Sequence, residues 1–139
     1  MDQIRASSGI TLSLVAADDD EIVGHVLFSP VTIRSERDEF RALGMGPVAV
    51  RPDRQKQGVG SGMIRAGLDR LRQQGNGIVV VEGHPAYYAR FGFRDAGRYG
   101  LSCEFSPPPG CFMVLELRAG ALAGRTGTAY YLPEFQRVG

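Results

Sequence analysis

The sequence predicts an α/β (α+β) fold in which a mostly antiparallel sheet holds a central parallel pair of strands and is flanked by helices. Three observations predict it: a β-hairpin signal near the N-terminus, a strand interrupted by Gly46-Pro47, and a strand–helix–strand unit across residues 40–81. That unit is typical of a right-handed crossover between parallel strands. Because proline donates no ladder hydrogen bond and glycine adds no packing, we expect a bulge at Gly46-Pro47 where the parallel pair opens.

Composition is that of one globular domain, which we assign to residues 1–139. The chain is 43% hydrophobic and 22% charged, with 16 basic and 15 acidic residues and a formal net charge of +1. This balance provides no field for nucleic acid or an anionic membrane, so neither is an expected partner. No apolar run is long enough to span a bilayer and no signal-peptide pattern is present, so we expect a cytoplasmic protein. Cys103 and Cys111 lack a CxxC spacing or a histidine pair, which favours buried free thiols over a metal site.

The first half of the chain predicts three strands. Residues 10–16 alternate apolar and polar side chains, and residues 21–28 follow after a short acidic turn, which together indicate a hairpin. Residues 40–50, FRALGMGPVAV, form the third strand and contain the Gly46-Pro47 interruption.

The second half begins with a helix over residues 58–74, where Ile64, Leu68 and Leu71 share one face and Gly75 permits a left-handed cap. The continuous apolar run Ile78–Val81 is typical of a strand buried on both faces beside a parallel neighbour. Three further elements are expected. A short helix that begins with proline covers residues 85–90, a clear strand covers residues 112–117, and an edge strand covers residues 128–132.

The loop before the long helix has the chemistry of an anion site. Gly58 and Gly60 remove side chains where the backbone must approach a ligand closely, and the segment continues into a helix N-terminus. Four amides there have no partner within the helix and the dipole adds about half a positive charge, so a pyrophosphate fits. An ordinary glycine-containing turn is the alternative, and neither GxxxxGK[ST] nor GxGxxG is present.

Two motifs in order resemble one family. Gln55-Lys56-Gln57-Gly58-Val59-Gly60 resembles the acetyl-CoA pyrophosphate signature [Q/R]-x-x-G-x-[G/A] of the GCN5-related N-acetyltransferases (GNAT), and Tyr87-Tyr88-Ala89-Arg90-Phe91-Gly92-Phe93 resembles its later [L/F]-Y-x-[K/R]-x-G-F element. The segments IVGHVLFSPV and HPAYYARFGF are similar to the YhbS-like branch of predicted acetyltransferases. The resemblance covers residues 10 to the C-terminus.

The resemblance implies an N-acetyltransferase that moves the acetyl group of acetyl-CoA to a primary amine of a small molecule or protein by direct attack. The pantetheine arm would lie in the opened strand pair and the diphosphate on the loop, while Lys56 or Arg54 either reaches a 3′-phosphate or is solvated. Tyr88 would protonate the thiolate, and Glu82 or His84 would accept the amine proton directly or through water. The implied cofactor-binding residues are Val48, Ala49, Val50, Gln55, Lys56, Gln57, Gly58, Val59, Gly60 and Ser61.

The sequence departs from the family at two places. Leu43-Gly44-Met45 has no acid where some members carry a glutamate, and only residues 1–8 precede the first expected strand, where the family has a strand and helices that cover the acceptor side. We therefore expect an incomplete acceptor wall, which a second copy in a homodimer would complete. A non-catalytic acyl-CoA-binding or regulatory module and a small β-rich interaction domain are the alternatives.

Overall fold

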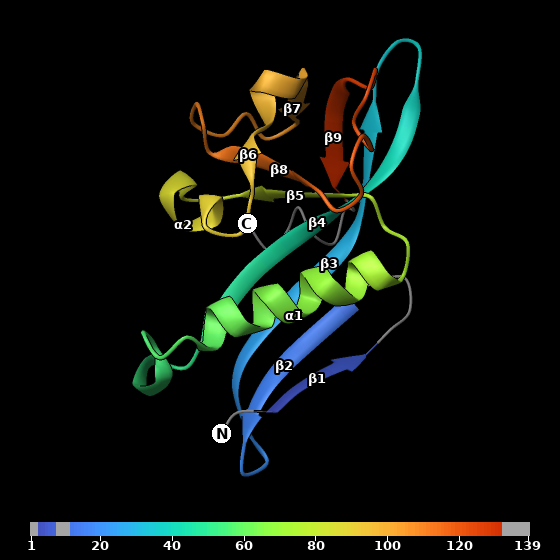
Figure 1. Cartoon of the computed structure of the whole chain (residues 1–139). Coiled ribbons are helices and arrows are strands. Elements are labelled where there is room, and N and C mark those ends of the chain that lie inside the picture. Colours follow the sequence, from blue (N-terminus) through green and yellow to red (C-terminus); the bar gives the residue numbers. More distant parts are fainter. Residues whose placement is uncertain (1–2, 8–11, 132–139) are drawn as a thin grey trace.

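The computed structural model describes residues 3–7 and 12–131 (Figure 1). In chain order the elements are β1 (Gln3–Ser7), β2 (Leu12–Asp18), β3 (Glu21–Arg34), β4 (Glu39–Val50), the 3-10 helix η1 (Pro52–Arg54), α1 (Val59–Gln73), β5 (Ile78–Glu82), α2 (Pro85–Ala89), β6 (Arg94–Asp95), the 3-10 helix η2 (Ala96–Tyr99), β7 (Leu101–Cys103), β8 (Phe112–Glu116) and β9 (Gly127–Tyr131).

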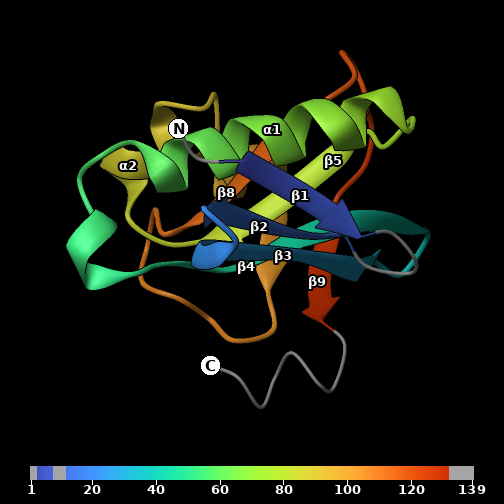
Figure 2. The ribbon, with the colours of Figure 1, turned by 90° about the horizontal axis from the view of Figure 1, so that it is seen from below.

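The strands form one mixed sheet that curls into a half-barrel, which confirms the predicted fold class. The order is β1-β2-β3-β4-β5-β8-β6, and β9 joins by pairing with both β3 and β7. The β4–β5 pair is parallel as predicted, and β7–β9 is a second parallel pair that the sequence did not indicate. In Figure 2, α1 covers one face of the sheet and β9 projects on the other.

The predicted N-terminal hairpin is confirmed, but it is not the first strand pair. Asp18 pairs with Glu21 across a two-residue turn in which Asp19 and Asp20 have positive φ angles of 49° and 68°, as in the tight turns that suit twisted hairpins. Residues 8–11, where the expected first strand begins, lie outside the described residues. The expectation that no strand precedes this hairpin is wrong, because β1 pairs antiparallel with β2. Its QIRAS segment does alternate polar and apolar residues, but five residues with only two apolar ones are too few to indicate a strand.

The predicted bulge lies in β4. Val26 pairs with Val48 and Phe28 pairs with Met45, so a single residue of β3 faces two residues of β4, Gly46 and Pro47. This extra residue shifts the register between the two strands. The part of β4 that follows the bulge is thereby offset from the part that pairs with β5.

Helix α1 packs on the sheet through a single face. Met63, Ile64, Leu68 and Leu71 are buried at the spacing that the sequence predicted. Gly67 lies on the same face of the helix. A Cβ there would stand 2.5 Å from the ring of Phe28 on β3, so the glycine allows the helix to approach the sheet this closely. None of the helices in the described ranges is long and apolar enough to cross a membrane.

A second core fills the inside of the half-barrel, on the face opposite α1. It joins alternate residues of β3 and β5 to β7, β8 and β9. The strand predicted at residues 128–132 is present as β9 up to Tyr131, and residue 132 lies outside the described residues. Its predicted place at an edge is wrong, because β9 pairs with both β3 and β7. The expected free thiols are confirmed, with Cys103 buried and Cys111 half-buried.

Candidate functional site

The parallel pair at the centre of the sheet is short and then opens. Only Leu43–Val79 and Gly44–Val80 are partners between β4 and β5. Beyond them β4 continues to Val50 along β3, while β5 continues to Glu82 along β8. The two strands therefore diverge at the bulge, as predicted.

Backbone groups on β4 are directed into this opening. The Arg51 amide donates to the Val23 carbonyl on β3 at 2.7 Å. Because the backbone groups of a strand alternate between its two sides, Ala49 also faces β3, whereas Val48 and Val50 present their amides and carbonyls to the opposite, open side. Of the three residues predicted to bind the pantetheine arm, Val48 thus has both backbone groups on the open side, and Val50 has its amide there while its carbonyl accepts from Gln55 Nε2.

The loop from β4 to α1 is braced by its own glutamines. Gln55 Nε2 donates to the Val50 carbonyl at 3.1 Å, and Gln57 Oε1 accepts from Arg54 Nε at 3.2 Å. Lys56 and Gly58 have positive φ angles of 65° and 82°. These two left-handed residues turn the chain sharply just before α1 begins.

The amides that follow are not used inside the protein. Across the described ranges, residues 56–61 donate no hydrogen bond through their backbone nitrogens, and the first amide that does so is Gly62, to the Gly58 carbonyl at 2.9 Å. These six donors include the first turn of α1, where the helix dipole adds positive potential. A Cβ on Gly58 would meet nothing within 4 Å, so this loop is open to a ligand.

Two of the three cations in this loop are held by carboxylates. Arg51 Nε lies 2.7 Å from Asp53 Oδ1, and Arg54 Nη1 lies 2.6 Å from Asp18 Oδ2 on β2. These hydrogen bonds hold the pKa of Asp53 and of Asp18 below the usual range. Lys56 is exposed and takes part in no ion pair within the described segments, so of the two residues predicted for a 3′-phosphate it is the more available.

The aromatic motif lies beside the opening, on the face covered by α1. Tyr87 and Tyr88 on α2 pack edge to face with ring centroids 5.0 Å apart, and Tyr88 also packs against Phe93. A Cβ on Gly83 would overlap the Tyr88 ring, so the glycine provides the surface on which that ring lies. Burial raises the pKa of Tyr88, with a smaller contribution from Tyr87, and the phenol is therefore protonated at neutral pH.

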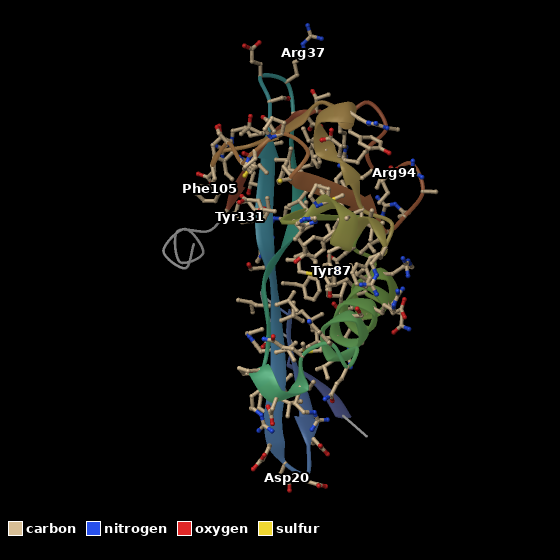
Figure 3. The ribbon with its side chains drawn as sticks, turned by 90° about the vertical axis from the view of Figure 1, so that its left-hand side faces the viewer. Asp20, Arg37, Tyr87, Arg94, Phe105 and Tyr131 are labelled. Atoms are coloured by element: carbon tan, nitrogen blue, oxygen red, sulfur yellow. The ribbon has the colours of Figure 1, made fainter. Side chains whose placement is uncertain are left out.

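Tyr87 connects α2 to the start of α1. A Cβ on Gly60 would stand 3.5 Å from the Tyr87 hydroxyl oxygen, 3.5 Å from Val50 Cγ2 and 3.6 Å from Val48 Cγ1. Figure 3 shows Tyr87 between the two helices. Tyr87 is half-buried and packs against the core beneath α1.

The opposite face of the opening carries Glu82, the last residue of β5. Residues of β5 alternate between the two cores, with Val79 and Val81 toward α1 and Ile78 and Val80 in the half-barrel, so the Glu82 side chain is directed to the half-barrel face. There Glu82 Oε1 accepts a hydrogen bond from Cys103 Sγ at 3.0 Å.

Tyr131 of β9 covers the same face. A Cβ on Gly44 would stand 2.8 Å from Tyr131 Cε2, so the position where some family members carry an acid is occupied here by a tyrosine ring. Burial, together with Cys103, Glu82 and Glu104, raises the pKa of Tyr131. Neither Cys103 nor Tyr131 was predicted as a site residue, because their link to Glu82 depends on long-range pairing.

His84, the other predicted base, has a different place. It precedes α2, and its carbonyl accepts from the amides of Tyr87 and Tyr88 at 3.1 Å and 3.2 Å. Its exposed side chain has no hydrogen bond to another described residue. The structure thus places Tyr88 and Glu82 on opposite faces of the opening, with Gly83 between them in sequence and in contact with the Tyr88 ring. It leaves the His84 side chain exposed.

Comparisons with known proteins agree with this arrangement. A sequence model of the acetyltransferase (GNAT) domain matches residues 5–96. The N-acetyltransferase YhbS of Escherichia coli K12 is 38% identical over 135 residues, which are 96% of this chain and 80% of YhbS.

Two solved structures are similar over most of the chain. The crystal structure of Escherichia coli YhbS in complex with CoA superposes with a TM-score of 0.83 at 38% identity, covering 92% of this chain and 71% of that one. A GNAT family acetyltransferase from Brucella melitensis in complex with acetyl-CoA has a TM-score of 0.70 at 36% identity, covering 91% and 69%.

Proposed function

The chain belongs to the GNAT acetyltransferase family, and from that premise we propose that it transfers the acetyl group of acetyl-CoA directly to a primary amine of a small molecule or peptide in the cytoplasm. The observation that carries the proposal is the opening between β4 and β5 directly in front of the unused amides of residues 56–61. Two relatives crystallised with CoA and acetyl-CoA support the choice of ligand.

Acetyl-CoA fits the opening as an additional strand. The pantetheine arm would pair with the backbone amide and carbonyl of Val48 and with the Val50 amide, a form of β-augmentation, with the exposed Ala49 side chain beside them. The diphosphate would accept hydrogen bonds from the amides of residues 56–61 at the start of α1. Lys56 would then contribute charge at the rim, because it is the cation of this loop that no described carboxylate holds.

The reaction needs a neutral amine, a thioester and a proton for the leaving thiolate. The amine nitrogen attacks the thioester carbonyl, a C–N bond forms and the C–S bond breaks. Tyr88 gives its phenolic proton to the CoA sulfur, for which its raised pKa keeps it in the protonated state. No acyl-enzyme step is included, because burial and the carboxylate of Glu82 raise the pKa of Cys103 to about 12 and leave no thiolate to attack.

We assign the base to Glu82 rather than to His84. The Glu82 carboxylate lies at the end of β5 on the half-barrel face, where its orientation is fixed by a hydrogen bond. The amine would approach from this face and lose its proton to Glu82 directly or through one water. Glu82 then releases that proton to solvent, and the Tyr88 phenolate takes up a proton from solvent, which restores both groups. His84 lacks any such partner among the described residues.

The experiment combines binding with turnover. Isothermal titration with acetyl-CoA should show one site, and release of free CoA thiol should follow with at least one member of a panel of putrescine, lysine and a tripeptide with a free N-terminus. Tyr88→Phe should lower kcat by about 10²-fold or more, as expected for loss of a general acid. Tyr130→Phe is the matched control, because Tyr130 is exposed on β9.

Two results would contradict the proposal in different ways. Absence of acetyl-CoA binding by the folded chain rejects the site itself. Binding without thiol release for any amine in the panel indicates instead a non-catalytic acyl-CoA-binding module.

A further inference from the structure

A hydrogen bond between two walls of the half-barrel determines where the proposed base points. β7 pairs only with β9 among the described strands, and β9 pairs with β3, so no backbone ladder connects β7 to β5. The contact between Cys103 Sγ on β7 and Glu82 Oε1 on β5, at 3.0 Å, nevertheless joins them across the interior. Resting on the assignment of Glu82 as base, we propose that Cys103 is a positioning residue whose thiol holds the Glu82 carboxylate toward the amine acceptor.

Cys103 is suited to this task by its surroundings. Its side chain is buried, with 6% of the residue exposed. Burial first, and then the hydrogen bond to Glu82, raise the pKa of the thiol to about 12. The sulfur therefore keeps its proton across the physiological range, and it acts on the carboxylate as a donor rather than as a second negative charge.

Glu82 needs such a donor because the rest of its environment leaves the side chain unrestrained. Its backbone is fixed by pairing with Phe112 on β8, but the residue itself is exposed. A carboxylate at a strand end has free rotation about its side-chain torsions, and each fixed side chain costs conformational entropy. A single directed hydrogen bond from the opposite wall selects one of these orientations before the acceptor arrives.

Other titratable groups lie near the Glu82 carboxylate. Glu104 follows Cys103 on the chain, Tyr131 comes from β9, and His84 lies two residues along from Glu82. Cys103 faces the carboxylate from β7 and donates to it at 3.0 Å, so removing the thiol releases the carboxylate from this orientation.

Three substitutions separate the hydrogen bond from the volume of the side chain. Cys103→Ala and Cys103→Val both lack a donor, and the valine keeps the site filled. Cys103→Ser restores a donor in a group of similar size. Isothermal titration with CoA verifies that each variant retains the fold and the cofactor site.

The expected kinetics use the amine from the panel that gives the fastest thiol release. With Cys103→Ala and Cys103→Val, kcat falls about 3- to 10-fold, the value of one hydrogen bond, and the KM for acetyl-CoA stays at the wild-type value. Cys103→Ser returns kcat toward wild type. A purely structural role predicts instead that valine is tolerated and serine is harmful.

A second readout does not require turnover. In protein carrying ¹³C-labelled glutamate, NMR relaxation of the Glu82 side chain, assigned through Glu82→Gln, should show more motion in Cys103→Ala and Cys103→Val than in wild type or Cys103→Ser. Unchanged motion of Glu82 in the two variants without a donor overturns the inference. If Glu82→Gln keeps the wild-type rate, the assignment of the base fails instead, so the two failures are distinguishable.

Discussion

Gly60, the second residue of α1, offers a substitution that should stabilise the protein and weaken its ligand binding. A Cβ at this position would contact Tyr87, Val50 and Val48 at 3.5–3.6 Å, which is ordinary van der Waals contact and displaces nothing. Replacing glycine by alanine in a helix stabilises it by roughly 0.5 kcal/mol. For a chain of this size that corresponds to a rise in Tm of about 1–3 °C.

The same methyl group would lie between α1 and the proposed path of the pantetheine arm, where it would displace the arm and the diphosphate attached to it from the helix amides. Hydrogen bonds to charged groups contribute about 1.5–3 kcal/mol each. Losing one of them should weaken acetyl-CoA binding by about 10- to 100-fold. The added carbon faces the valines of β4 and the Tyr87 hydroxyl, the three groups that flank the proposed path of the pantetheine arm.

Calorimetry measures both quantities on one sample. Scanning calorimetry reports Tm, which suits a chain without tryptophan, and isothermal titration reports the Kd for CoA. Gln73→Ala, at the exposed C-terminal end of α1, is the control that changes helix propensity without touching the site. An unchanged Kd in Gly60→Ala would refute the reasoning that the diphosphate lies against this turn.

Three other substitutions test separate parts of the structure. Tyr87→Phe should raise the KM for acetyl-CoA by about 3- to 10-fold, the value of one neutral hydrogen bond, and leave kcat unchanged. If steady-state kinetics show instead a loss of kcat like that of Tyr88→Phe, the roles of the two tyrosines are reversed. Within the described part of the chain the buried Ser29 hydroxyl has no hydrogen-bond partner, so Ser29→Ala should leave the free energy of unfolding equal or raise it by about 1 kcal/mol, measured in urea. Arg54 holds the pKa of Asp18 below its usual value. The stability that this pair contributes is therefore complete above the unfolded pKa of about 3.9 and disappears as the pH falls through the folded pKa. Asp18→Asn should consequently show a smaller decrease of Tm between neutral and acid pH than wild type.

Local patterns predicted the cofactor side of the molecule well. The interruption at Gly46-Pro47, the two-sided burial of β5 and the glycines around the start of α1 are each read from a few neighbouring residues, and the structure confirms the bulge, the parallel pair and the helix. Periodicity and turn chemistry depend only on residues that are close in the chain, so they can be recognised in a single sequence without knowledge of long-range contacts.

The half-barrel face was not predictable in the same way. β7 has three residues and β6 has two, which is too short for any alternation to be seen. The partners of β9 lie far away in sequence, and nothing in residues 127–131 indicates that both of its sides are paired. Cys103 was correctly expected to be a buried thiol, but its hydrogen bond to Glu82 arises only when the sheet curls.

The length of β3 determines the order in which the molecule can assemble. Its first part pairs with β2 and β4, its immediate neighbours in sequence, whereas Val31 near its end pairs with Tyr131, a hundred residues later. Closing so long a loop is slow compared with forming a hairpin. During synthesis on the ribosome, residues up to Tyr88 emerge before β7 and β9 do. The opening between β4 and β5 is therefore able to form before the strand that carries Cys103, the partner of Glu82, has been synthesised.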